Sequence, residues 1–334
     1  MDTPIGHYLD DPKEFFWWLN HSVTSVVALN AAVNMGLLGA LGDAPATVEE
    51  LAAKCGIAAD KLGRIVNFLA AEEIVSLLAD GRVVHTSRSR ALSGLKSALA
   101  WESNCFEAGI PLHRALRKGT TSCEERFGKP VFALLRGNPD MAAVFSDFMG
   151  YLTRLVESFV FTQHRFEPFT RAVDVGGSHG GLLLQLLARH PHASGILFDL
   201  PEVTAMVADE VGGAEHGDRV EIVGGDFFES VPSGDLYLLK MILHDWNDEE
   251  CKAILANVRK SIVPGGRIAV IDYVIPEVPR LHPSVAMDIA MLIWATGRER
   301  KLSEFHELFG ASGFAFDRLT ENPLGQSVVE AVAI

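Results

Sequence analysis

Residues 172–181 read AVDVGGSHGG, and residues 196–201 read ILFDLP. The first pattern predicts an apolar strand, a turn of small residues and a helix, and the second predicts a strand that ends on Asp199. Glycines let the backbone of such a turn approach a ligand closely, and the helix N-terminus offers free N–H groups. Because an acid at the end of the next strand can accept both hydroxyls of a ribose, these residues predict a nucleoside-binding site.

The spacing of the glycines bears on which nucleoside binds. A dinucleotide fingerprint needs glycine at positions 176, 178 and 181, but Ser178 occupies the middle position. Hydride-transfer chemistry is therefore disfavoured. A turn without a ligand stays open as an alternative, because glycine-rich turns recur in many α/β folds.

The composition is that of an ordinary globular protein. With 334 residues, 48% of them hydrophobic, the chain can bury two cores, and we expect two domains. The formal net charge of −14 argues against a nucleic-acid partner, since phosphate binding uses clustered Lys and Arg. Asp2, Asp10 and Asp11 do not suit a secretory signal, so we expect a cytoplasmic protein.

The cysteines fit a reducing compartment. They form no C-x-x-C pair and have no histidine ligands nearby, so neither a zinc site nor a disulfide framework is expected. These residues are Cys55, Cys105, Cys123 and Cys251.

Residues 15–42 contain no charged side chain, and the segment is long enough to span a bilayer. Its polar side chains would each need a partner in hydrocarbon, whereas in water they can bond to one another or to solvent. These are Asn20, His21, Ser22, Thr24, Ser25, Asn30 and Asn34. We therefore expect no membrane contact, and we expect a second subunit to help cover so apolar a helix.

Residues 47–85 show a winged-helix pattern. Thr47 and Glu50 form a capping box at a helix start, and a second helix and a hairpin follow. DNA binding is the competing function, but residues 1–100 hold eight Lys and Arg against eleven Asp and Glu. We therefore expect a helical, winged-helix-like dimerisation domain over residues 1–100. The expected ranges are 61–73 for the second helix and 74–78 and 83–85 for the hairpin strands.

From residue 166 onward, apolar strands alternate with helices. Such alternation predicts a parallel sheet covered on both faces, and the turn at residues 322–325 makes the last two strands an antiparallel hairpin. The expected strands are 171–175, 195–199, 221–224, 236–240, 267–274, 314–319 and 327–333, with helices after Gly180, Glu202, Asp248 and Ser303. The second domain is expected over residues 101–334, with connecting helices at 101–165 and an α/β core at 166–334.

Ligands of such sheets bind at the carboxyl ends of the strands. His244 follows the fourth strand, Asp272 lies on the fifth, and Glu299 precedes the last helix. One histidine can thus lie near two acids. This arrangement suits general base catalysis, because the ordinary histidine pKa of about 6.5 leaves the ring mostly neutral in the cell.

These motifs resemble, in order and spacing, those of the dimeric small-molecule O-methyltransferases that use S-adenosylmethionine. That family includes the plant caffeate, flavonoid and hydroxyindole enzymes and bacterial enzymes of antibiotic and phenazine biosynthesis. The resemblance covers nearly the whole chain. The matching stretches are 174–180, FDLP at 198–201, GGDFF at 224–228, Lys240, HDW at 244–246, Asp272 and GRER at 297–300.

The resemblance implies a seven-stranded Rossmann-like sheet, a C-terminal antiparallel hairpin and a homodimer. It implies that His244 is the general base, that Asp272 and Glu299 hold its ring, and that no metal takes part. The residues that it places around S-adenosyl-L-methionine are Gly176 at the amino-acid part, Asp199 at the ribose, Asp226 and Phe227 at the adenine, Lys240 on an oxygen, and Leu200 and Gly225 as further contacts. S-adenosyl-L-homocysteine is the implied product.

For the acceptor pocket, the family uses side chains from the helix before the catalytic core and from the helix before the second acid. Here these are Phe145, Met149, Met291 and Trp294. All four are apolar or aromatic and suit a flat aromatic acceptor. Plain helix packing stays open as the alternative for each of them.

Two positions depart from the family pattern. Ser178 stands where most members have glycine, and the turn is expected to survive if the φ angle of Ser178 is negative. His179 stands where threonine is common. We expect His179 to face solvent or cap the turn, since the base pattern is complete elsewhere.

The sequence therefore predicts a metal-independent O-methyltransferase that acts on a hydroxyl of a small aromatic or polyketide-like secondary metabolite. Relatives of this fold that methylate nitrogen, hydroxylate or perform pericyclic reactions are one alternative, which His244, Asp272 and Glu299 together disfavour. A non-catalytic transcription factor that senses the cofactor or a metabolite is the other. The acidic charge of the chain disfavours that second alternative.

Overall fold

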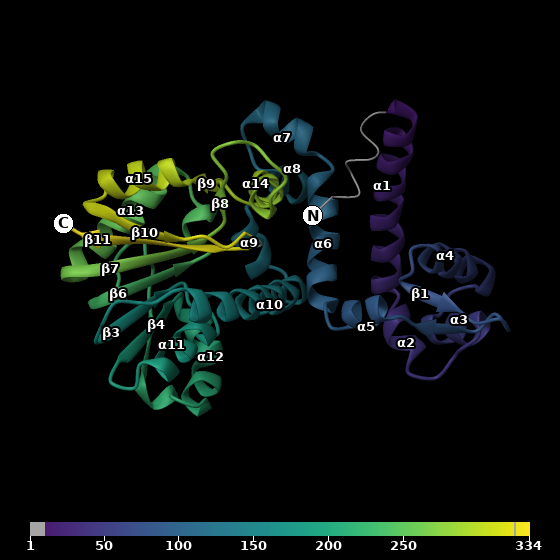
Figure 1. Cartoon of the computed structure of the whole chain (residues 1–334), viewed down its shortest axis with the longest axis horizontal. Helices are drawn as coiled ribbons and strands as arrows, with labels where there is room; N and C mark the ends of the chain where they lie inside the picture. Colours follow the sequence, from purple (N-terminus) through teal and green to yellow (C-terminus); the bar gives the residue numbers. More distant parts are fainter. Residues whose placement is uncertain (1–10, 324) are drawn as a thin grey trace. The chain divides into compact units, whose positions relative to one another are not determined.

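The computed structural model describes residues 11–323 and 325–334. Asp2, Asp10 and residue 324, which enter the arguments above, lie outside the described residues. The chain divides into two compact units, one that ends at Asn104 and one that begins at Cys105 (Figure 1).

The N-terminal unit is built from helices and one hairpin. Asp11 caps the first helix, and Gly36, with a φ of +73°, separates it from the second. Thr47 and Glu50 form the expected capping box. The elements are α1 (Pro12–Asn34), α2 (Leu37–Leu41), α3 (Val48–Cys55), α4 (Ala59–Ala71), β1 (Val75–Leu77), β2 (Val83–His85), α5 (Ser87–Ser93) and α6 (Lys96–Gly109), which crosses the boundary between the units.

Several polar side chains of α1 form hydrogen bonds within the N-terminal unit. Ser22, Thr24 and Ser25 each donate a hydrogen bond of 2.9 Å to the carbonyl four residues earlier, and His21 pairs with Glu72. Among the described residues, no helix combines the length and apolar character that crossing a membrane requires.

The C-terminal unit begins with helices and continues as an α/β sheet. The helices are α7 (Leu112–Lys118), α8 (Ser122–Phe127), α9 (Val131–Arg136), α10 (Pro139–Gln163), α11 (Gly181–Arg189), α12 (Pro201–Gly213), α13 (Asp248–Ser261), α14 (Pro283–Trp294) and α15 (Leu302–Ala311). The strands are β3 (Arg171–Val175), β4 (Ser194–Asp199), β5 (Val220–Gly224), β6 (Gly234–Lys240), β7 (Ile262–Asp272), β8 (Val274–Ile275), β9 (Arg300–Lys301), β10 (Phe314–Thr320) and β11 (Ser327–Ala333).

Seven of these strands form one sheet in the order β10-β11-β7-β6-β3-β4-β5. Neighbours pair in parallel except at β11, which runs antiparallel to both β10 and β7 and so forms the expected hairpin. The short β8 and β9 pair separately. The doubly wound sheet with its antiparallel C-terminal hairpin agrees with the prediction.

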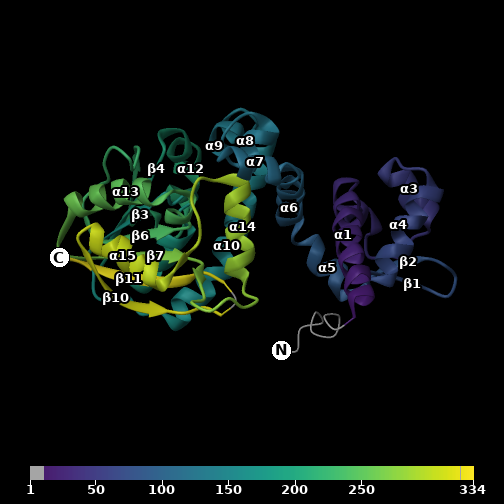
Figure 2. The same ribbon diagram turned by 90° about the horizontal axis from the view of Figure 1, so that it is seen from above.

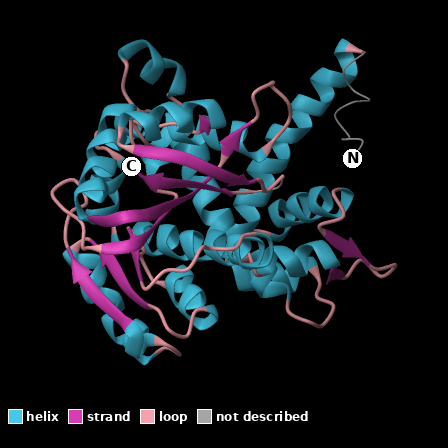
Figure 3. Ribbon diagram, turned by 60° about the vertical axis from the view of Figure 1, so that its left-hand side comes forward, coloured by secondary structure: helices cyan, strands magenta, loops and turns pink. Residues whose placement is uncertain are grey.

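Side chains alternate between the two faces along each strand, and helices cover both faces, so both are buried. Val173 and Val175 of β3 pack with α13 and α15 on one face, whereas Ala172 packs with α10, α11 and α12 on the other. Figures 1 and 2 show α13 and α15 over the sheet from two directions, and Figure 3 shows helices on both of its faces.

The expected strand at residues 267–274 has different bounds in the structure. β7 begins at Ile262, includes Pro264 and Gly265, and ends at Asp272. The proline and glycines read as a turn in the sequence, but Ile262 pairs with Gly234 of β6 across a register shift. Long-range pairing thus overrides the local turn propensity.

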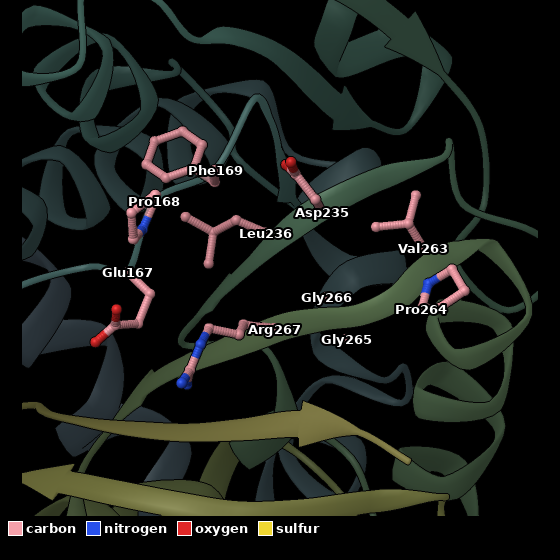
Figure 4. A pocket seen from close by; sticks show the side chains of 10 residues that line it. All are labelled: Glu167, Pro168, Phe169, Asp235, Leu236, Val263, Pro264, Gly265, Gly266 and Arg267. Carbon is pink, nitrogen blue, oxygen red and sulfur yellow. The ribbon is translucent and has the colours of Figure 1, made fainter.

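A hollow of about 240 Å³ lies at the amino ends of β6 and β7 (Figure 4). Asp235, Leu236 and residues 263–267 line it together with Glu167, Pro168 and Phe169. His244 follows the carboxyl end of β6, so this hollow is at the opposite edge of the sheet from the residues expected to be functional.

Candidate active site

The glycine turn, residues 176–180, joins β3 to α11 with an unusual backbone. Gly176, Ser178 and Gly180 have φ values of +68°, +50° and +69°. A Cβ atom at position 176 would collide with the side chain of Ile242. The condition of a negative φ at Ser178 is therefore not met, and the turn forms with a serine in a conformation that favours glycine.

Asp199 ends β4 beside this turn. Its Oδ2 accepts the Ser178 N–H at 2.9 Å, and its Oδ1 accepts the Leu200 N–H at 2.7 Å. Burial raises the pKa of Asp199, and these two N–H groups oppose that rise. Because a carboxylate has about four lone-pair sites, Asp199 keeps capacity to accept ribose hydroxyls.

The segment after β5 lies next to Asp199. Gly225 donates its N–H to the Asp199 carbonyl at 2.9 Å, and a Cβ atom on Gly225 would lie 2.6 Å from the Phe198 ring. Asp226 turns back to accept the Phe228 N–H at 2.8 Å, and Phe227 meets Trp246 edge to face. The residues expected around the ribose and adenine are thus brought together at the ends of β4 and β5.

Lys240 ends β6. Burial lowers the pKa of its ammonium group, and the carboxylates of Asp174 and Asp272 oppose this shift. Burial also raises the pKa of Asp174 to about 7. Asp174 and Lys240 therefore form an electrostatically linked pair of buried groups at the carboxyl ends of β3 and β6.

His244 lies on a single 3₁₀ turn, Leu243–Asp245, and is only 3% exposed. Its Nδ1 lies 2.8 Å from Oε1 of Glu299, and its Nε2 lies 3.5 Å from Oδ1 of Asp245. Glu299 is held in turn by its own N–H, which donates to Asp288 at 2.9 Å. A carboxylate thus fixes one ring nitrogen, and the other is directed away from it.

The charges around His244 change its proton affinity. Burial by itself lowers the pKa of His244, but the carboxylates of Glu299 and Asp245 outweigh burial and raise this pKa to about 10. Burial raises the pKa of Glu299, which His244 opposes. The ring is therefore protonated near neutral pH in the absence of another cation, unlike the mostly neutral histidine expected from the ordinary pKa.

Two further acids near His244, Asp272 and Asp245, do not form the short contact that Glu299 makes with the ring. The buried carboxylate oxygens of Asp272 have no hydrogen-bond partner among the described residues, and burial raises the pKa of Asp272 to about 6. Burial likewise raises the pKa of Asp245 to about 6. Sequence reasoning gave Asp245 no role of its own, although its place directly after the histidine was a usable signal.

Arg300 is a second residue that sequence reasoning missed. Its guanidinium is 1% exposed and donates to the carbonyls of Leu243 and Trp246 at 2.8 and 2.9 Å and to Asp248 at 2.7 Å. These bonds hold both ends of the turn that carries His244. The signal was present in the GRER stretch, because a buried arginine needs several acceptors.

The expected acceptor residues lie on two helices. Phe145 and Met149 are partly buried one turn apart on α10. Met291 and Trp294 are buried near the end of α14, which leads to Glu299. This placement is compatible with both a pocket lining and helix packing.

His179 contacts two helices. Its Nε2 lies 2.8 Å from Oγ of Ser146 on α10, and its Nδ1 lies 3.3 Å from Oε2 of Glu210 on α12. The side chain is 43% exposed. His179 thus faces solvent in part, as expected, and in addition bridges two helices.

The residues at this edge of the sheet fit an adenosylated ligand. The glycine turn passes this edge in a left-handed conformation that keeps its backbone free of bulky side chains at Gly176 and Gly180, and Asp199 retains acceptor capacity beside it. A buried histidine held by a carboxylate lies after the neighbouring strand β6. Such an arrangement can bind a nucleoside and exchange a proton with a second molecule.

Comparisons with known proteins identify the family of this chain. The family model described as an O-methyltransferase domain matches residues 111–315. A phenazine O-methyltransferase of Lysobacter antibioticus is 33% identical over 322 residues, which cover 94% of this chain and 93% of that protein.

Solved structures are similar over most of the chain. A mitomycin 7-O-methyltransferase has a TM-score of 0.90 and 27% identity, with 96% of this chain and 98% of that chain covered. An O-methyltransferase from neocarzinostatin biosynthesis, solved with S-adenosyl-L-homocysteine and 1,4-dihydroxy-2-naphthoic acid, has a TM-score of 0.82 and 26% identity. The match covers 93% of this chain and 96% of that chain.

Proposed function

Because this chain belongs to the S-adenosylmethionine-dependent O-methyltransferase family, we propose that it methylates a hydroxyl of a small aromatic or polyketide-like secondary metabolite, with His244 as general base. The observation that carries the proposal is the buried His244–Glu299 pair at the carboxyl edge of a methyltransferase sheet. The phenazine and naphthoic acid compounds in the names of similar proteins support an aromatic acceptor.

S-adenosyl-L-methionine, when bound, would supply the methyl group of its sulfonium sulfur to the acceptor oxygen and would leave as S-adenosyl-L-homocysteine. Gly176, Asp199 and Leu200 would hold its amino-acid and ribose parts. Gly225, Asp226 and Phe227 would surround the adenine, and Lys240 would contact an oxygen. Phe145, Met149, Met291 and Trp294 would pack against the acceptor ring and orient its hydroxyl, which can supply much of the acceleration.

His244 must be neutral at Nε2 to accept the hydroxyl proton. A sulfonium cation bound close by would lower the raised pKa of His244, because like charges disfavour the imidazolium. Glu299 would keep the proton on Nδ1 of the neutral ring, and Nε2, which lies 3.5 Å from Asp245, would then be the base. The buried acids then stabilise the imidazolium that forms as the proton is transferred.

A labelled-methyl assay tests this assignment. Purified protein is incubated with methyl-labelled S-adenosyl-L-methionine and a panel of hydroxylated aromatic compounds, and products are identified by mass and position of the label. His244→Gln is expected to lower turnover by about 10²–10⁴-fold while S-adenosyl-L-homocysteine still binds. Label on nitrogen alone, or full turnover of His244→Gln, would contradict the proposal.

Metal independence is part of the proposal. A histidine base makes a bound Mg²⁺ unnecessary for deprotonating the acceptor, so incubation with a chelator is expected to leave the initial rate unchanged. Loss of the rate with chelator and its return with Mg²⁺ would overturn this part and leave the O-methylation itself intact.

An exposed apolar face on α1 of the N-terminal unit supports the proposal that the protein is a homodimer. Phe16, Leu19, Val23 and Val26 recur at helical spacing on α1, and each is between 47% and 58% exposed. A face of this kind is typical of a protein interface. A second copy of the chain, seated on this face, would cover it.

A further inference from the structure

His179 connects the glycine turn to two helices. Because Glu210 accepts hydrogen bonds only, Nδ1 of His179 carries a proton and donates to it. Nε2 can then accept the hydroxyl hydrogen of Ser146 at 2.8 Å. One imidazole ring thus contacts both partners and joins α10 to α12 across the turn.

The same turn is fixed from the side of the sheet. Gly176 donates its N–H to the Phe198 carbonyl at 2.8 Å, and Ser178 donates to Asp199 at 2.9 Å. β4 therefore holds one side of the turn, and His179 holds the other. A left-handed serine in the turn makes such support useful, because that backbone conformation is disfavoured for a residue with a side chain.

The partner of His179 on α10 is also informative. Ser146 follows Phe145 directly and lies less than one turn from Met149, so the helix expected to contact the acceptor is tied to the turn expected to contact the donor.

We propose that His179 is a positioning residue that fastens the glycine turn to α10 and α12 and thereby slows the dissociation of the methyl donor and of its product. This inference rests on the proposed function, because it takes the glycine turn as the donor site. Ser146 is the main anchor, since the contact with Glu210 is longer and Glu210 is 70% exposed.

Calorimetric binding of S-adenosyl-L-homocysteine tests the bridge without an acceptor. We expect His179→Ala and Ser146→Ala each to weaken binding by about threefold to tenfold, which corresponds to one net hydrogen bond. The double variant should bind no more weakly than His179→Ala, because both changes remove the same contact. His179→Gln, whose amide can reach both partners, should restore binding to within about twofold of the wild type.

Matched control variants distinguish loss of the His179–Ser146 contact from the effect of removing any exposed side chain. His192→Ala removes another exposed histidine, and Ser158→Ala removes an exposed serine elsewhere on α10. Neither should change binding. The dissociation rate of the ligand, measured by stopped flow, should rise in parallel with the dissociation constant. Melting temperatures without ligand identify any variant that is unfolded, and Ser146→Ala and His179→Gln then provide the comparison.

Two negative results have different meanings. If the wild type does not bind S-adenosyl-L-homocysteine, the proposed function fails. If the wild type binds and both His179→Ala and Ser146→Ala bind within about twofold of it, the bridge has no role and the proposed function stands.

Discussion

The backbone conformation of Ser178 lowers the stability of the folded protein. Its φ of +50° lies in the left-handed region, where a side chain is disfavoured by about 1 kcal/mol relative to glycine. We predict that Ser178→Gly raises the free energy of unfolding by about that amount and leaves the bond from its N–H to Asp199 intact. Chemical denaturation of both proteins measures the difference. A lower free energy of unfolding for Ser178→Gly would contradict the claim that Ser178 is strained.

His244 makes the stability of the protein depend on pH in a defined direction. Its folded pKa of about 10 exceeds the unfolded value, so its contribution is complete below about pH 6.5 and is lost as the pH rises through 10. Within that window the folded state binds the extra proton, and the unfolding free energy falls by up to about 1.4 kcal/mol per pH unit. We predict a shallower fall for His244→Gln in urea unfolding between about pH 7 and pH 9.

A control histidine makes this comparison specific. His192→Gln changes an exposed histidine and should keep the wild-type pH dependence. Equal slopes for the wild type and His244→Gln would mean that the Glu299 and Asp245 carboxylates do not hold the proton on His244 in the folded protein.

At the scale of elements, Gly297 sets the distance between two loops of the site. A Cβ atom there would collide with backbone atoms of residues 244–246, and the Gly297 N–H donates to the Asp245 carbonyl at 3.2 Å. We predict that Gly297→Ala destabilises the protein by about 1–3 kcal/mol and lowers turnover about a hundredfold, because it displaces the turn of His244 from Glu299. Unfolding and labelled-methyl assays measure both effects.

Gly212 is the matched control within a helix of the same unit. It lies on α12, and no atom lies within 4 Å of its added Cβ. Gly212→Ala should leave turnover unchanged and raise stability by about 0.5–1 kcal/mol through helix propensity. If Gly297→Ala behaved like Gly212→Ala, the close approach of the two loops would be irrelevant to the site.

At the scale of the whole molecule, the face of α1 defined by Phe16, Leu19, Val23 and Val26 predicts the oligomeric state. We expect the wild type to be a dimer by light scattering and Phe16→Glu with Val23→Glu to be a monomer, because two charges would be buried unpaired at the interface. Met206→Glu replaces an apolar residue on α12 that is even more exposed, at 74%, and should stay dimeric. A dimeric double variant would rule out this face as the interface.

Much of the architecture was predictable from local pattern. β3 and β11 have the predicted bounds, because each strand is a short, mostly apolar run. The predicted start of β7, residue 267, lies five residues after the observed start at Ile262. Pro264 and Gly265 suggest a turn, but pairing with β6 overrides that local preference.

The sequence by itself determined the order of elements, the glycine turn between β3 and α11 and the residues gathered at the carboxyl edge of the sheet, because periodicity and motif spacing are local properties. Tertiary structure alone decided that Glu299 bonds to Nδ1 of His244, that Asp272 bonds to neither ring nitrogen, and that Ser178 is left-handed. It also decided the proton affinity of His244. These properties depend on groups far apart in the chain, such as His244 and Glu299, whose burial and separation only the packed sheet defines.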